Sequence, residues 1–293
     1  MIIGDLQGGL GNQLFQIFTT IAFALDHKEP FCFPDNLLRK TRGRYARHTY
    51  WSTFLRSLGK FTMDMTTITD PIELVQEQEF RHVPICRKYK RHVTMLTGYY
   101  QSPLYFDKHK DSIIKLTMIE QHKRRLIHNK FPCFNFTDTI SLHIRMGDYK
   151  LFPDKYPILD ANYYVQSLCH IIQTAKMETA PIKVVFFCES QDLYDGENLI
   201  TQIIQLYSEK SGRENHLAFE RASPILADWE QMILMSLCNH NIIANSTFSW
   251  WGAYFNTAPD KLVCYPKTWF KPGFVADTST LCPTDWMPVE NSW

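Results

Sequence analysis

Three polar side chains stand close together in the middle of the chain, and their types suit the binding of a negatively charged leaving group. Residues 141–149 read SLHIRMGDY, which places His143, Arg145 and Asp148 within one short segment. A planar guanidinium can hold two phosphate oxygens at once, which an ammonium cannot. The alternative is a local surface ion pair between Arg145 and Asp148, which contributes about 0 to 1 kcal/mol and needs no ligand.

The stretch before Arg145 is predicted to be a β-strand that ends at these side chains. Thr139–Ile144 is rich in β-branched and apolar residues in alternation. His143 and Arg145 then project to one face, and Gly147 relaxes the backbone after them. Because ligands of open α/β sheets collect at the carboxyl ends of strands, a ligand is expected here.

A glycine-rich loop near the start of the chain is a second candidate binding element. Gly4–Gln16 reads GDLQGGLGNQLFQ, in which glycines at positions 8, 9 and 11 allow close approach of the backbone to a ligand. The amides of Asn12 and Gln13 can bond sugar hydroxyls or a phosphate. The loop also imitates the G-x-G-x-x-G of dinucleotide folds, with Asp35 at the spacing of a ribose-binding acid, but Leu14 replaces the third glycine.

Three segments in this order resemble the signature regions of one family, the inverting α-1,2-fucosyltransferases of glycosyltransferase family 11. They are the glycine-rich loop, the block at 141–149, and NSTFSWW within Asp228–Tyr254. Lesser matches lie at Gly98–Phe106 and Ile158–Leu168, so the resemblance spans almost the whole chain. One position departs from the family pattern, because Met146 stands where the family usually has a second Arg.

The resemblance implies an α/β fold of the GT-B type, with two Rossmann-like domains and a cleft between them. We expect residues 1–135 to form the acceptor-side domain and residues 136–293 to bind the GDP-sugar. It implies GDP-fucose as the donor and a glycan as the acceptor, with no further cofactor. It also implies a function, the transfer of L-fucose with inversion to a sugar hydroxyl, most often the 2-OH of a galactose-like residue.

The resemblance and the chemistry together give a set of expected site residues. Arg145 stabilises the departing diphosphate, Asp148 is the candidate base or a buttress of Arg145, and His143 contacts the fucose or its diphosphate. The loop contacting donor or acceptor comprises Gly9, Gly11, Asn12 and Gln13. The expected donor-binding residues, besides Arg145, are Glu189, Ser190, Asp192, Asp228, Asn245, Ser246, Thr247, Phe248 and Ser249.

Each of these assignments has a structural alternative. Asn245, Ser246 and Thr247 have the composition of an ordinary helix N-cap, which can coexist with a phosphate cradle. Phe248, Trp250 and Trp251 are typical of core packing around that helix. Asp228 has the position of a first-turn acid, which the helix dipole favours. No D-x-D, H-E-x-x-H or clustered His/Cys set occurs, so no metal is expected.

Composition favours a folded globular protein and makes nucleic acid an unlikely partner. Apolar residues make up 45% of the 293 residues, and the formal net charge is +1. Basic clusters at Arg39–Arg47, Arg87–Arg91 and Lys123–Arg125 are expected to be solvated faces. Eight scattered cysteines without a C-x-x-C pair are expected to be free thiols. No signal peptide or membrane-spanning run is recognisable, which predicts a cytoplasmic enzyme.

The expected elements alternate, which predicts parallel sheets with helices on both faces. The expected strands are 1–6, 30–34, 93–97, 139–144, 182–188, 241–244 and 262–265. The expected helices are 14–26, a long one within 105–129, and four near 161–175, 192–210, 226–239 and 247–257. Two rivals to the fucosyltransferase hypothesis stay open, namely a transferase that uses another GDP-deoxyhexose and a non-catalytic protein that binds a GDP-sugar or glycan.

Overall fold

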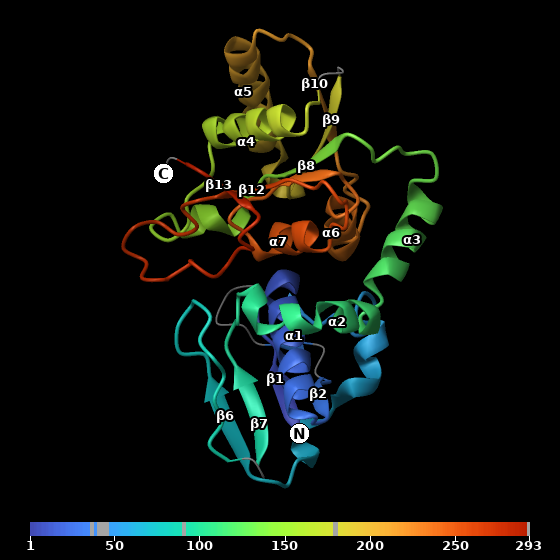
Figure 1. The fold of residues 1–293 in the computed structure, drawn as a ribbon, viewed down its shortest axis with the longest axis vertical. Helices are drawn as coiled ribbons and strands as arrows, with labels where there is room; N and C mark the ends of the chain where they lie inside the picture. Colours follow the sequence, from blue (N-terminus) through green and yellow to red (C-terminus); the bar gives the residue numbers. More distant parts are fainter. Residues whose placement is uncertain (36–37, 40–46, 90–91, 178–180, 292–293) are drawn as a thin grey trace. The chain divides into compact units, whose positions relative to one another are not determined.

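Two α/β units make up the protein in the computed structural model, which describes residues 1–35, 38–39, 47–89, 92–177 and 181–291 (Figure 1). The first unit comprises Met1–His122 and Ala276–Pro283, and the second comprises Lys123–Val275 and Thr284–Trp293. The division falls earlier than the expected junction at residue 135. The side chain of Lys123 bonds within the second unit, where its Nζ donates to the carbonyl of Phe255 at 2.5 Å.

A five-stranded sheet forms the centre of the first unit, and every neighbouring pair of strands in it is parallel. The strand order is β5-β2-β1-β7-β6. The strands are β1 Ile2–Asp5, β2 Phe31–Pro34, β5 Thr62–Met63, β6 Ile72–Gln76 and β7 Val93–Thr97. A separate antiparallel pair consists of β3 Leu38–Arg39 and β4 Arg47–His48.

The first helix follows β1 directly and packs on it. Helix α1 spans Leu10–His27, four residues longer at its start than the apolar spacing predicts. Its first turn takes in the glycine-rich loop, because Gly9 is the N-cap and its carbonyl accepts from the amide of Gln13 at 3.0 Å. The strand, loop and helix opening predicted from the sequence is therefore confirmed.

The single long helix expected within 105–129 is wrong, since two helices occupy this region. Helix α2 spans Lys110–Leu116 and α3 spans Ile119–Lys130. Met118 between them has a φ of 59°, which no α-helix accommodates. The hydroxyl of the buried Thr117 donates to the carbonyl of Ile113 at 2.7 Å and so satisfies the end of α2. The change of backbone direction at Met118 brings Ile119 into the core, where its side chain is fully buried.

A six-stranded sheet, again parallel throughout, forms the second unit. Its order is β10-β9-β8-β11-β12-β13. The strands are β8 Thr139–His143, β9 Ile182–Phe187, β10 Leu217–Arg221, β11 His240–Ile242, β12 Val263–Pro266 and β13 Met287–Val289. Counted along the chain this order is 3-2-1-4-5-6, the strand order of the doubly wound nucleotide-binding folds.

Helices cover both faces of the second sheet. They are α4 Ala161–Thr174, α5 Leu193–Ser211, α6 Asp228–Met235 and α7 Thr247–Tyr254. In Figure 1, α4 and α5 lie side by side on one side of the sheet, and α6 and α7 lie together on the other. Short 3₁₀ helices join the elements, at Arg56–Phe61, Met65–Thr67, Pro103–Tyr105, Asp107–His109, Gly147–Leu151 and Ser190–Asp192. The prediction of two Rossmann-like α/β domains is confirmed.

Candidate active site

The two segments that carry the strongest sequence signals follow two neighbouring strands. Arg145 comes just after β8 and Asn245 just after β11, and these strands pair in parallel. The chain leaves β8 in one direction across the sheet and β11 in the other, so the strand order reverses between them. Such a switch point, at the carboxyl ends of the strands, is where open α/β sheets bind ligands.

The guanidinium of Arg145 is held by two carboxylates from different elements. Its NH1 donates to Oε1 of Glu189, which follows β9, and its NH2 donates to Oδ1 of Asp148. Burial works to lower the pKa of Arg145, but the negative charges of Glu189 and Asp148 and the Tyr149 side chain outweigh it and raise the pKa above its ordinary value. The guanidinium is therefore permanently charged and fixed in direction.

A tyrosine that the sequence analysis did not single out joins Arg145 to the Asn245 turn. The guanidinium lies over the ring of Tyr149, 5.2 Å from its centroid, and the Tyr149 hydroxyl donates to the carbonyl of Asn245 at 2.7 Å. The ring stacks on Tyr156 with centroids 4.1 Å apart. Burial raises the pKa of Tyr149, so its hydroxyl stays protonated. The only signal for this role was the place of Tyr149 in the 141–149 block.

His143 is an uncharged member of the site. Its side chain is 6% exposed and its ring lies 5.7 Å from that of Phe248. Burial and, to a smaller extent, the charge of Arg145 lower the pKa of His143 to about 3. Its Nδ1 is buried and has no hydrogen-bond partner in the described part of the chain. His143 can thus exchange a neutral hydrogen bond with a ligand but cannot supply positive charge.

The Asn245 turn is a helix start that also ties two loops together. The amide Nδ2 of Asn245 donates to the carbonyls of Pro157 and Trp269, both at 3.1 Å. Its Oδ1 is buried without a partner among the residues described. Ser246 is the N-cap of α7 and accepts from the amide of Phe248 at 3.3 Å, so the predicted N-cap is confirmed.

The remainder of this segment packs as a structural core. Ser249 is buried, and its hydroxyl accepts from the amide of Ala244 at 3.2 Å. Trp250 and Trp251 are fully buried, which confirms the core-packing interpretation for both. Thr247 is the first residue of α7 and is partly exposed, as is Phe248. Thr247 and Phe248 therefore remain the accessible residues of the turn.

The three residues expected to contact guanine or ribose after β9 have protein partners. Asp192, 5% exposed, accepts from the amide of Gly147 at 2.5 Å and from Nζ of Lys150 at 2.7 Å. The hydroxyl of Ser190 accepts from Arg221 at 3.3 Å. Asp192 thus anchors the loop that carries Arg145. Gly147 has a φ of +35°, a backbone conformation that favours glycine.

Asp228 and Met146 are two further positions that the sequence singles out. Asp228 begins α6, beyond the end of β10, and accepts from the amide of its neighbour Trp229 at 2.7 Å, the position of a first-turn acid. Met146, at the position of the family's second arginine, is 8% exposed and belongs to the hydrophobic core between the sheet and α4. The loop after β8 therefore offers one guanidinium where the family pattern has two.

The glycine-rich loop lies at the carboxyl end of β1, the central strand of the first sheet. It follows β1, whose neighbour β7 leads to Gln101, and Nε2 of Gln101 donates to Oδ1 of Asn12 at 2.9 Å. Nε2 of Gln13 donates to the carbonyls of Gly8 and His48 at 3.0 and 2.9 Å, while its buried Oε1 has no partner among the described residues. Gly8 has a φ of +79°, and a Cβ there would lie 2.5 Å from Nδ2 of Asn12. Gly9, Gly11, Asn12 and Gln13 thus belong to the first unit, whereas Arg145 belongs to the second.

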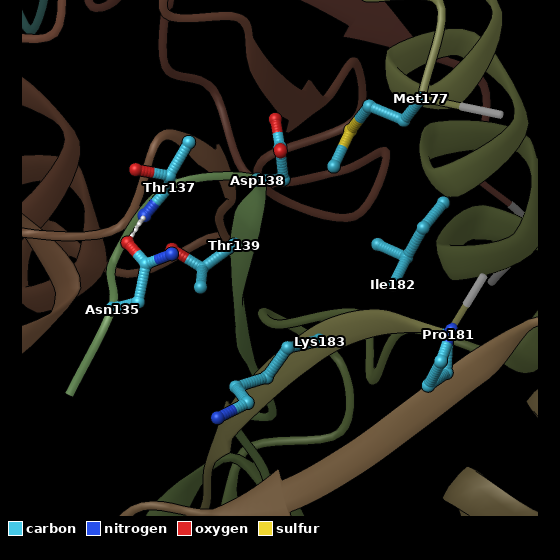
Figure 2. Close-up of a pocket in the computed structure, with 8 residues that line it drawn as sticks. All are labelled: Asn135, Thr137, Asp138, Thr139, Met177, Pro181, Ile182 and Lys183. Carbon is cyan, nitrogen blue, oxygen red and sulfur yellow. Dashed lines mark hydrogen bonds between the residues drawn. The ribbon is translucent and has the colours of Figure 1, made fainter. Parts of the chain in front are cut away.

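One hollow of about 320 Å³ lies elsewhere, at the amino ends of β8 and β9 (Figure 2). It is lined by Asn135, Thr137, Asp138, Thr139, Met177, Pro181, Ile182 and Lys183. None of the expected site residues lines it. The hollow sits at the end of the strands away from Arg145, so it plays no part in the site described here.

Other expectations about the chain have mixed outcomes. Lys123 is 5% exposed, so its assignment to a solvated basic face is wrong, whereas Arg124 and Arg125 are exposed. The cluster at 39–47 lies mostly outside the described residues, as do positions 90 and 91. All eight cysteines are free.

Over the described residues, no group of three His, Cys, Asp or Glu side chains could hold a metal. In the same residues, no helix has the length and apolarity needed to cross a bilayer.

Comparisons with known proteins agree with the resemblance seen in the motifs. Residues 74–290 match the profile of glycosyl transferase family 11. The chain is 28% identical to the O-antigen biosynthesis glycosyltransferase WbnK of Escherichia coli, over 90% of this chain and 93% of the relative. It is 25% identical to an alpha-1,2-colitosyltransferase of E. coli over 99% of each protein. It is 24% identical to the galactoside alpha-(1,2)-fucosyltransferase 2 of Oryctolagus cuniculus, over 96% of this chain and 78% of the relative.

These matches decide which class of protein the chain belongs to, a point on which the sequence left alternatives open. The dinucleotide-binding alternative for the glycine-rich loop loses its basis, because the family profile and the relatives are those of glycosyltransferases. The profile covers well over half of the chain. The protein therefore belongs to glycosyl transferase family 11 and is a glycosyltransferase for fucose-like sugars.

Proposed function

We propose that this enzyme transfers L-fucose from GDP-fucose to the 2-OH of a galactose-like residue, with inversion at the sugar carbon and without a metal ion. The observation that carries the proposal is the link from Arg145 through Tyr149 to the Asn245 turn, at the switch point of the second sheet. The relatives named for α-1,2 transfer support the acceptor position.

Stabilisation of the leaving diphosphate is the first catalytic role that the site can perform. Negative charge grows on the diphosphate as the bond to the sugar breaks, and preorganised donors aimed at that charge lower the barrier. Arg145 offers its guanidinium, and the start of α7 offers backbone N–H groups and the positive end of the helix dipole. Ser246 accepts from Phe248 through Oγ and keeps its own O–H available to donate.

Removal of the acceptor proton is the second service, and Asp148 is the candidate group. The contact of Asp148 with Arg145 supports the buttress role, since one carboxylate oxygen is engaged with the guanidinium. An oxocarbenium-like transition state delays loss of the acceptor proton, so a weak base suffices. We keep Asp148 as the base and Arg145 as the group that orients it.

Placement of the acceptor is assigned to the first unit. Asn12 and Gln13 lie in the first turn of α1, beyond the carboxyl end of β1, and Gln13 retains a buried Oε1 with unmet bonding capacity in the described chain. We assign the acceptor or the sugar end of the donor to the loop of Gly9, Gly11, Asn12 and Gln13. In this scheme residues 1–135 serve the acceptor and residues 136–293 serve the nucleotide.

A second candidate donor is GDP-colitose. Colitose is fucose without the 3-hydroxyl, and the match to the colitosyltransferase covers 99% of both proteins. The buried Met146, in place of a second arginine, marks a difference from the usual fucosyltransferase pattern next to the donor site. A site that bonds the 3-hydroxyl of fucose would reject colitose strongly, because its polar groups would be left unpaired.

The test is a donor panel with analysis of the product. GDP-fucose, GDP-colitose and GDP-mannose are offered with β-galactosides, and the linkage and anomeric configuration of each product are determined by NMR. We expect GDP-fucose to give an α-1,2 product. A kcat/KM at least tenfold higher for GDP-colitose than for GDP-fucose would make GDP-colitose the donor. Turnover with neither GDP-fucose nor GDP-colitose would overturn the proposed donor class.

A further inference from the structure

The guanidinium of Arg145 is engaged by carboxylates of the protein itself. Both terminal nitrogens of the guanidinium already donate to carboxylates, NH1 to Glu189 and NH2 to Asp148. Its Nε is buried without a partner among the described residues. Each terminal nitrogen carries a second N–H, but a diphosphate that takes the two N–H groups now bonded to Glu189 and Asp148 has to displace a carboxylate oxygen.

The charges around the loop favour this replacement. Arg145 faces Glu189 and Asp148, and Lys150 faces Asp192 and Asp195 with both bonds at 2.7 Å. Two cations thus meet four carboxylates, and the lowered pKa of His143 keeps this residue neutral. A dianionic or trianionic diphosphate would enter a region of net negative charge unless a carboxylate moved away.

The geometry distinguishes the carboxylate that can leave. Asp148 lies in the same short 3₁₀ helix as Gly147, three residues from Arg145 and on its own loop. Glu189 comes from the loop after β9 and is the more exposed of the two, at 41% against 33% for Asp148. Its second oxygen accepts from Nε2 of Gln191 at 2.8 Å, a bond that can remain when Arg145 is released. Arg221 lies beside the next residue, where it donates to the hydroxyl of Ser190.

We propose that Glu189 occupies the diphosphate position on Arg145 in the free enzyme and is displaced by the donor, so that Glu189 sets the affinity for the nucleotide. The role differs from the contact with guanine or ribose expected from the sequence. It rests on the proposed function, because it requires a diphosphate at Arg145. In the free enzyme the carboxylate keeps the guanidinium aimed at the site, and the cost of removing it weakens donor binding.

The experiment compares binding of GDP and of guanosine by isothermal titration calorimetry. Glu189→Gln keeps the shape of the side chain and removes the charge, and we expect it to lower the Kd for GDP about tenfold. Guanosine has no phosphate, so its Kd should be the same in both proteins. Glu209→Gln is the matched control, because Glu209 is exposed near the far end of α5 and its loss changes the net charge equally. The control should leave both Kd values within twofold.

The outcomes separate this inference from the proposed function. If the unmodified enzyme binds no GDP, or binds it equally well after Arg145→Ala, the proposed function fails. If GDP binding needs Arg145 but Glu189→Gln leaves the Kd unchanged or raises it, the displacement by the donor is refuted. Weaker binding of both GDP and guanosine in Glu189→Gln would instead assign Glu189 to the guanosine. An equal fall in the Kd for GDP in Glu209→Gln would show that the change in net charge alone causes the effect. That result would also refute the inference.

Discussion

At the scale of single residues, the site depends on one cation and one uncharged histidine. Burial keeps His143 neutral, whereas the carboxylates around Arg145 keep its guanidinium charged. Met146 adds no second charge because a thioether is neutral, and its side chain is part of the core. Within residues 145–151 the positive charge offered to a leaving group therefore comes from Arg145 and from Lys150, which is already paired.

Replacement of Arg145 tests directly whether this side chain supplies the positive charge that stabilises the leaving group. We expect Arg145→Ala to lower kcat about 10² to 10³-fold, the range seen when a transition-state charge stabiliser is lost. Arg145→Lys should recover only part of the rate, since an ammonium cannot form the fork. Arg125→Ala, which removes an exposed arginine, serves as the control in the same steady-state assay. Turnover close to that of the unmodified enzyme in Arg145→Ala would reject the assignment.

Asp148→Asn distinguishes the two roles of this carboxylate. If Asp148 acts as the base, kcat falls while the Kd for GDP stays the same. If it acts only as a buttress of Arg145, both the rate and the affinity for GDP fall. We expect the first pattern, and parallel measurements of single-turnover rate and GDP binding decide it. Equal losses in the two quantities would leave Asp148 as a positioning residue.

The pKa of His143 predicts a specific dependence of stability on pH. The pKa is about 3 in the folded enzyme and about 6.5 in the unfolded chain, so the unfolded chain binds more protons between these values. The contribution of His143 is fully present above pH 6.5 and is lost as the pH falls toward 3. We expect His143→Asn to reduce the slope of unfolding free energy against pH between 6.5 and 4 by about one proton, measured by urea denaturation. An unchanged slope would contradict a neutral, buried histidine.

At the scale of elements, four loops at the carboxyl edge of the second sheet, those after β8, β9, β11 and β12, are joined by side-chain hydrogen bonds. Asp192 from the loop after β9 holds Gly147, and Tyr149 from the loop after β8 reaches the carbonyl of Asn245. Asn245 in turn bonds Pro157 and, beyond β12, Trp269. The position of Arg145 relative to the start of α7 is thus a property of loops that bond one another across the sheet.

Removal of the Asn245 amide should loosen this arrangement. Asn245→Ala leaves the carbonyls of Pro157 and Trp269 without their donor, and we expect a loss of about 2 to 4 kcal/mol in unfolding free energy. The affinity for GDP should fall as well, because α7 begins next to Asn245. Asn135→Ala, at an exposed position, should change stability by less than about 0.5 kcal/mol. A stability loss in Asn245→Ala as small as that of the control would show that the two bonds do not hold the loops.

At the scale of the whole molecule, both units place their candidate ligand groups by the same rule. In the first unit β1 is the central strand of the sheet, and in the second the strand order reverses between β8 and β11. The glycine-rich loop follows β1 and Arg145 follows β8. Each half of the enzyme therefore presents its candidate ligand groups at the carboxyl edge of its own parallel sheet.

Hydrogen exchange with bound GDP tests which unit takes the nucleotide. We expect slower exchange of backbone amides in residues 145–151, 189–192 and 245–249, with residues 4–16 little affected. The protected segments are those that carry Arg145, Glu189 and Asn245. Arg145→Ala is the control, in which GDP at the same concentration should no longer protect them. Protection confined to residues 4–16 would place the nucleotide in the first unit instead.

The sequence by itself determined the interior strands and the composition of the site. The expected strands correspond to β1, β2, β7, β8, β9, β11 and β12, which are interior strands of the two sheets. The strands it missed in the two parallel sheets, β5, β6, β10 and β13, are the sheet edges, and it also missed the short pair β3 and β4. An interior strand is buried on both faces and reads as an apolar run, whereas β6 at an edge is exposed at alternate residues and leaves no such signal.

Only the tertiary structure decided which side chains meet. Glu189 and Asp148 lie 41 positions apart in the chain, yet parallel pairing of β8 with β9 brings both onto Arg145. Lys123, read from its neighbours as a surface charge, is buried because the end of α7 needs a donor for the carbonyl of Phe255. Local sequence encodes the burial pattern and turn chemistry of each segment, but a contact between loops depends on strand order, which no segment carries alone.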